Sequence, residues 1–180
     1  MFILDWWDFI EKFLHDGGVL MYPLLIVTFF LWTFLIERLY YILKVFPNDA
    51  KNLLGQWEKS KFVNHWVKAK LRKNHLVHMR SKVKYHIGTI KLLVALAPMI
   101  GLLGTVDGMI DIFDVMSAMG TSNARLMAAG ISTATITTMV GLVISLSGFY
   151  LSTYLDERGD RDLEILEDQM RIDHSGEVNV

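Results

Sequence analysis

The feature that most constrains this chain is a run of 30 residues, 126–155, that contains no charged side chain. A helix rises about 1.5 Å per residue, so roughly 20 residues cross the hydrocarbon core of a bilayer. The run therefore predicts a transmembrane helix that tilts or extends beyond the core. Two further apolar runs, residues 19–36 and about 87–106, are long enough to span. The sequence predicts an all-α integral membrane protein with three transmembrane helices.

Basic residues predict the orientation of these helices. Residues 37–91 hold 13 Lys or Arg against three acidic residues, whereas residues 1–18 and 107–125 hold one basic residue each. An excess of Lys and Arg marks cytoplasmic loops, while acidic residues contribute little. We therefore expect the N-terminus outside the cytoplasm and the loop of residues 37–86 inside. The tail, residues 156–180, is also expected inside, although it holds nine acidic residues.

The first 18 residues are expected to form an amphipathic helix on the outer side of the membrane. Trp6, Phe9 and Phe13 share one side of a helix, while acidic residues occupy the other. Trp anchors at the membrane interface favour a helix lying on the bilayer, and packing on a protein partner is the alternative. The segment lacks the basic start of a secretory signal. The remaining predicted segments are the second transmembrane helix with an outer extension, residues 87–119, and a periplasmic turn, residues 120–125.

Small residues repeat at helical spacing on both sides of this turn. If the two helices form an antiparallel hairpin centred near residue 121, residues whose numbers sum to about 242 lie at one depth. This register pairs Gly108 with Ala134 and Gly101 with Gly141, and it places Thr105 beside Thr137 and Thr138. Small residues let membrane helices approach closely. Gly101, Gly104, Gly108 and Gly141 are therefore the predicted helix-packing residues.

Several threonines gather near the middle of the hairpin. Thr105, Thr133, Thr137 and Thr138 are the candidate pore-lining residues, because hydroxyls at one depth can make a polar strip for water or a proton. The alternative is structural, since a Thr hydroxyl in a helix can bond the carbonyl four residues earlier. The sequence alone leaves both interpretations open.

Ionisable residues are absent from the first and third apolar runs. A proton carrier in a membrane normally needs a titratable side chain. The acidic residues Asp107, Asp111 and Asp114 lie toward the outer end of helix two. They could draw cations to a pore mouth, or they could form a solvated face outside the bilayer. The chain alone is therefore a poor proton relay, and a partner would have to supply the acid.

Enzymatic chemistry has little support in the sequence. There is no Cys, no nucleophile motif and no phosphate-binding loop, so we expect no catalytic residue and no cofactor. His75 and His78 have no carboxylate companions nearby, so no metal site is expected. The basic loop is expected to contact membrane lipid rather than nucleic acid.

Two motifs resemble a known family. Residues 97–113, APMIGLLGTVDGMIDIF, resemble the second-helix signature of the MotA/TolQ/ExbB proton channel family, and residues 130–146, GISTATITTMVGLVISL, resemble the third-helix signature. The Glu37-Arg38 pair that ends the first apolar run also resembles the family. The short length is most similar to an ExbB of a TonB system. The chain departs from many ExbB proteins at Thr133, where they carry Glu, and at Asp107, which is often apolar or aromatic.

The resemblance implies a function. Members of this family form a homopentamer around single-span partners, ExbD or TolR, whose Asp binds the proton. The family's pore threonines correspond to Thr105 and Thr138 in this sequence. The implied role is a transport subunit of the bacterial inner membrane, not an enzyme, that uses the proton motive force to drive a TonB-like protein. A TolQ-like role in envelope maintenance and a non-conducting membrane scaffold remain the alternatives.

Overall fold

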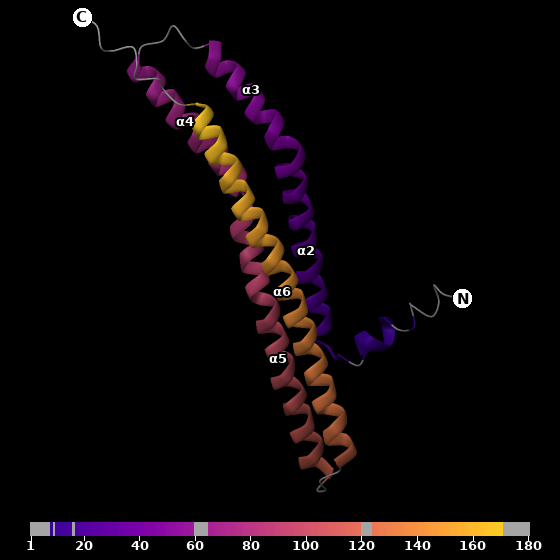
Figure 1. Cartoon of the computed structure of the whole chain (residues 1–180). Coiled ribbons are helices and arrows are strands. Elements are labelled where there is room, and N and C mark those ends of the chain that lie inside the picture. Colours follow the sequence, from indigo (N-terminus) through magenta and orange to yellow (C-terminus); the bar gives the residue numbers. More distant parts are fainter. Residues whose placement is uncertain (1–7, 9, 16, 60–64, 120–123, 171–180) are drawn as a thin grey trace, which may run out of the picture. The chain divides into compact units, whose positions relative to one another are not determined.

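The chain folds into a set of long helices, drawn in Figure 1. The computed structural model describes residues 8, 10–15, 17–59, 65–119 and 124–170. Residues 8 and 10–15 are helical. The elements that follow are α2 (Met21–Tyr40), the π-helical segment η1 (Tyr41–Val45), α3 (Phe46–Lys59), α4 (His65–Lys84), α5 (Ile87–Met119) and α6 (Ala124–Gln169).

Within the described ranges, three stretches of helix are long and apolar enough to cross a membrane, and they contain α2, α5 and α6. This confirms the predicted all-α architecture. The third helix extends beyond its charge-free run of residues 126–155, because α6 is 46 residues long and ends at Gln169. The continuation follows from apolar side chains at helical spacing, and Leu155, Leu163, Leu166 and Met170 are all buried. Most of the predicted turn lies outside the described residues.

The helices contribute to two compact units. The first unit joins the described residues up to Phe34 with Thr89–Tyr150, and so holds most of α2, α5 and α6. Its three helices meet at Gly148. A Cβ atom placed there would lie 2.7 Å from Val94 Cγ2 on α5 and 2.9 Å from Leu31 Cδ2 on α2. Leu31 itself is fully buried. The glycine therefore lets α2 pack against the hairpin of α5 and α6.

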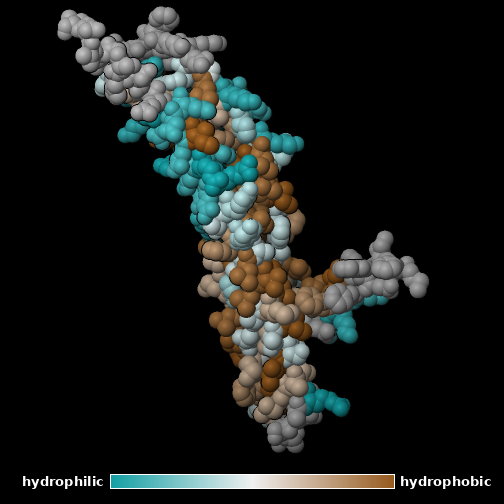
Figure 2. Space-filling view, viewed as in Figure 1, coloured by the Kyte–Doolittle hydropathy of each residue, from teal (hydrophilic) through white to brown (hydrophobic). Residues whose placement is uncertain are grey.

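The surface of this first unit is apolar. Phe29, Leu102 and Leu146 expose 62–68% of their area, and Figure 2 shows hydrophobic residues over much of the surface of α5 and the first part of α6. Soluble monomers rarely expose contiguous apolar patches of this kind. Such a surface is stable when lipid tails or other membrane helices cover it.

The second unit, Leu35–Gly88 with Leu151–Val180, is built like a soluble helical domain. Its apolar cluster joins three helices, with Phe46 from α3, Met79 and Val83 from α4, and Leu163 and Leu166 from α6. All five are at least 90% buried. Apolar burial of this kind is worth roughly 25 cal/mol per Å².

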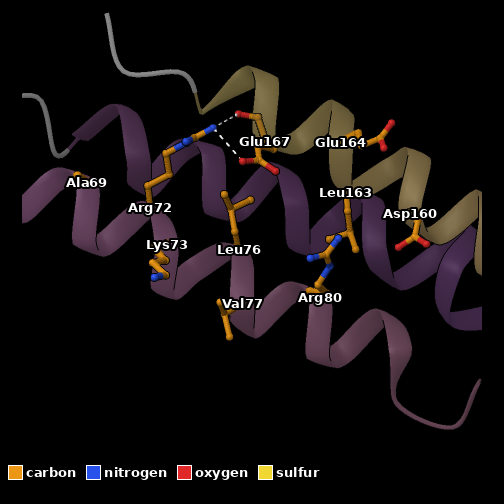
Figure 3. A pocket seen from close by; sticks show the side chains of 10 residues that line it. All are labelled: Ala69, Arg72, Lys73, Leu76, Val77, Arg80, Asp160, Leu163, Glu164 and Glu167. Atoms are coloured by element: carbon orange, nitrogen blue, oxygen red, sulfur yellow. Dashed lines mark hydrogen bonds and ion pairs between the residues drawn. The ribbon is translucent and has the colours of Figure 1, made fainter. Parts of the chain in front are cut away.

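Ion pairs on the surface of the second unit join α4 to its neighbours. Lys84 Nζ lies 3.0 Å from Asp160 and 3.5 Å from Asp156, both on α6. Figure 3 shows Arg72 of α4 reaching the carboxylate of Glu167 on α6. The Arg72 guanidinium also donates a hydrogen bond to the backbone oxygen of Glu167, at 3.0 Å. Exposed pairs each contribute at most about 1 kcal/mol. They help to fix which faces of α4 and α6 meet, while the buried cluster supplies most of the stability.

Candidate functional site

The helices α5 and α6 pack so closely that their backbones are in direct contact. A Cβ atom at Gly141 would lie 2.7 Å from the carbonyl oxygen of Ala97 and 3.2 Å from Gly101 Cα. A Cβ atom at Gly108 would lie 3.0 Å from that of Ala134. Side chains larger than hydrogen would separate the helices, which is why small residues occupy these positions. The Gly101–Gly141 and Gly108–Ala134 pairs follow the register that the sequence predicts.

The threonines do not face Thr105 as that register predicts. Gly104 faces Thr137, whose Cγ2 would lie 2.6 Å from a Cβ atom at the glycine, and Gly101 faces Thr138. Thr105 is therefore not the residue that faces these two threonines directly. The difference arises because each residue on a helix of 3.6 residues per turn packs between several residues of the facing helix, so the sum rule places partners only to within about one turn.

Thr138 spans the two helices of the hairpin. Its Oγ1 lies 2.9 Å from the carbonyl oxygen of Gly101 on α5 and 3.2 Å from that of Ala134 on its own helix. Its hydroxyl carries one hydrogen, which one of these carbonyls accepts. The oxygen keeps its lone pairs, and the side chain is only half-buried. Thr138 therefore presents a hydrogen-bond acceptor at the edge of the hairpin.

Thr105 lies on the same edge. It follows Gly101 by four residues, so the two share one side of α5. Its hydroxyl donates to the carbonyl oxygen of Leu102 at 2.7 Å, which again leaves the oxygen as an acceptor. Thr105 is also half-buried. One edge of the hairpin thus carries two hydroxyl groups whose hydrogens are already bonded to backbone carbonyls.

Thr137 and Thr133 belong to a different edge. Thr137 is 1% exposed, and its hydroxyl donates to the carbonyl oxygen of Gly17 at 2.7 Å. Gly18, the next residue, has a φ of +75°, a conformation that glycine adopts readily, and a Cβ atom there would lie 3.3 Å from Thr133 Cγ2. These two threonines therefore contact the segment before α2. Nothing in the sequence marked Gly17 as a partner, because its contribution is a backbone oxygen.

The outer acidic residues lie away from Thr105. Asp107, Asp111 and Asp114 are exposed and follow one another at spacings of four and three, so they share one side of α5. Asp107 follows Thr105 by two residues, which is about 200° around a helix. Within one chain, the acids and the Thr105 edge therefore face different directions.

Titratable groups are missing from the middle of the hairpin. Between Lys91 and Asp107 on α5, and from residue 126 to residue 155 on α6, no side chain carries a charge. Within the described ranges, no group of three His, Asp or Glu side chains is placed to hold a metal ion. The chemistry available at the Thr105 and Thr138 edge is hydrogen bonding to a group brought from elsewhere.

We expect Thr137→Val to loosen the N-terminal segment while leaving the α5–α6 contact in place. The change keeps the shape of the side chain but leaves the buried Gly17 carbonyl without its donor, at a cost of about 1–3 kcal/mol. Amide exchange of residues 17–21 should become faster by about tenfold or more. Thr135→Val is the matched control, because its exposed hydroxyl bonds only its own helix.

Two comparisons with known proteins show what the chain is similar to. The model of the MotA/TolQ/ExbB proton channel family matches residues 52–168, which include both helices of the hairpin and all of its threonines. A protein of Methanothermobacter thermautotrophicus, named as a candidate biopolymer transport protein and ExbB homolog, is 24% identical over 197 residues. That similarity covers 92% of this chain and 69% of the relative.

Proposed function

Because the chain belongs to the MotA/TolQ/ExbB proton channel family, we propose that it is a proton-channel and motor subunit of the bacterial inner membrane. In this proposal several copies, five by resemblance to the family, surround an ExbD-like single-span partner. The N-terminus is periplasmic and the tail is cytoplasmic. The assembly uses the proton motive force to drive a TonB-like protein and, through it, uptake across the outer membrane.

The observation that carries this proposal is the state of the hydroxyls of Thr105 and Thr138. Both donate their hydrogen to a backbone carbonyl, so each oxygen is free to accept. A protonated carboxyl group can donate to such an oxygen, whereas a carboxylate has only acceptors. The edge is therefore suited to bind the neutral form of a partner's acid.

A mechanism follows from this preference. When a proton neutralises the partner's Asp, that side chain can lie against the edge of the hairpin that carries Thr105 and Thr138. It can then donate a hydrogen bond to one of these two hydroxyl oxygens. Loss of the proton recreates a charge that the apolar surroundings disfavour, and the partner helix must move toward water. Alternation between these states turns proton passage into displacement of the partner.

The function is tested by deleting the gene for this chain and restoring it on a plasmid. We expect the deletion to abolish proton-dependent, TonB-dependent uptake while the outer membrane stays intact, and the plasmid to restore uptake. Leakage of periplasmic protein with normal uptake would assign the TolQ-like role instead. If uptake and the envelope are both normal but cytoplasmic proteins are mislocalised, the result would favour the non-conducting membrane scaffold.

A further inference from the structure

A cavity of about 270 Å³ lies in the second unit between the end of α2, the start of η1 and α4. Its lining includes Arg38, Tyr41, Ser81, Lys82 and Tyr85. Each of these five side chains carries a hydrogen-bond donor, and two are cations; Glu37 and His78 complete the lining. The proton path described above does not use this cavity.

Arg38 is the most unusual residue of this lining. It is 2% exposed, although Arg is rarely buried unless paired. Its Nη2 donates to the backbone oxygen of Lys82, and its guanidinium lies 4.7 Å from the centre of the Tyr41 ring. Among the described residues, nothing bonds its Nε or the buried hydroxyl of Tyr41. A buried donor without a partner costs about 1–3 kcal/mol, and more when charged, so an acceptor oxygen brought to these two donors would be stabilising.

The sequence positions of the residues that line the cavity indicate how deep it lies in the membrane. Arg38 follows the charge-free run of residues 19–36 by two positions, and Tyr85 precedes the first residue of α5 by two. Both segments therefore leave the apolar core at this level. Tyr40 and Tyr85 expose 59% and 65% of their area, and Tyr is enriched at the boundary between lipid and water.

The cavity is lined by cations and hydrogen-bond donors, and each acidic residue near it lies beside a basic one. Lys82 Nζ is exposed and lies 3.4 Å from Asp49 Oδ2, while the exposed hydroxyl of Ser81 precedes it. Glu37 also lines the cavity, but its carboxylate lies 3.8 Å from the Nε2 atom of His86, which offsets that charge when protonated. A guanidinium, an ammonium and hydroxyl donors together match the oxygens of a phosphate.

We propose that this cavity binds the phosphate of an anionic phospholipid in the leaflet that adjoins the basic loop. Arg38 supplies the fixed donors at the bottom of the site, and Lys82 and Ser81 close it from the water side. Leu39 and Leu43, which are exposed on the same stretch of helix, are available to the acyl chains. The site would fix α4 to the end of the first membrane span through a bound lipid.

The test is native mass spectrometry of the full chain in mild detergent, titrated with phosphatidylglycerol. Lys82→Gln removes the ammonium but keeps the backbone oxygen that Arg38 bonds. One cation near a membrane surface is worth about fivefold in affinity, so the dissociation constant of the most tightly bound lipid should rise about fivefold. The matched control is Lys73→Gln, an exposed lysine of the same helix that lines a different cavity. It should leave that constant within about twofold.

Further measurements distinguish a bound phospholipid from other sources of phosphate. Phosphatidylcholine of the same chain length should bind more weakly, and millimolar inorganic phosphate should not displace phosphatidylglycerol. Arg38→Lys keeps the charge but loses the Nε donor, so it should abolish the tightest binding. If Arg38→Lys fails to fold, Ser81→Ala tests the site instead. Displacement by inorganic phosphate, equal loss in Lys73→Gln, or an unchanged constant in Lys82→Gln would each overturn the proposal.

Discussion

Gly141→Ala should lower the melting temperature of this protein, although it adds only a methyl group. The new Cβ atom would lie 2.7 Å from the Ala97 carbonyl oxygen and 3.2 Å from Gly101 Cα. Both atoms belong to the backbone of α5, so no side chain can rotate away and the two helices must separate. Overpacking of this kind costs about 1–3 kcal/mol. The measurement is thermal unfolding in detergent, followed by circular dichroism.

Gly88→Ala is the control for this change. Gly88 lies near the start of α5, and a Cβ atom there would meet nothing within 4 Å. Ala favours a helix over Gly by up to about 1 kcal/mol, so this variant should melt at the wild-type temperature or slightly above. Equal melting temperatures for Gly141→Ala and the wild type would contradict the close approach of the two backbones.

Thr138→Val should reduce proton flux through the assembled complex by about tenfold or more. The variant keeps the size of the side chain but removes the acceptor that favours the protonated form of the partner's acid. A hydrogen bond of about 1–1.5 kcal/mol corresponds to roughly tenfold in an equilibrium. The flux is measured with a pH-sensitive dye inside vesicles that contain the chain and its single-span partner.

The loss in Thr138→Val has a structural alternative, because the same hydroxyl bonds the Gly101 carbonyl. Thr138→Ser separates the two explanations, since it keeps the hydroxyl and should keep most of the flux. Thr135→Val, whose hydroxyl bonds only its own exposed helix face, should have no effect. Wild-type flux in Thr138→Val, at equal protein levels, would remove this threonine from the proton path.

Much of the fold follows from the sequence because the bilayer leaves few options for an apolar run. Residues 19–36, 87–106 and 126–155 lie almost wholly within helices for that reason. The length of α6 was also predictable, since Leu163 and Leu166 continue a helical apolar face beyond the membrane run. The contact of Gly101 with Gly141 follows from the turn position and helix geometry.

Other features depend on backbone atoms or on tertiary packing that no residue pattern records. The partner of Thr137 is the carbonyl oxygen of Gly17, which any residue could have supplied. Arg38 ends an apolar run, where a solvated cation is expected, yet packing against α4 buries it. The π-helical turn of η1 inserts itself between α2 and α3 without a Gly or Pro inside it to mark it.

We expect this chain to pass protons only together with an acid from a partner. The most direct test is proton flux into vesicles under an imposed potential, with the chain alone, the chain with its single-span partner, and the chain with a partner whose Asp is replaced by Asn. We expect flux with the intact partner and none in the other two samples. Equal flux from the chain alone, or none in any sample of properly assembled protein, would contradict this expectation.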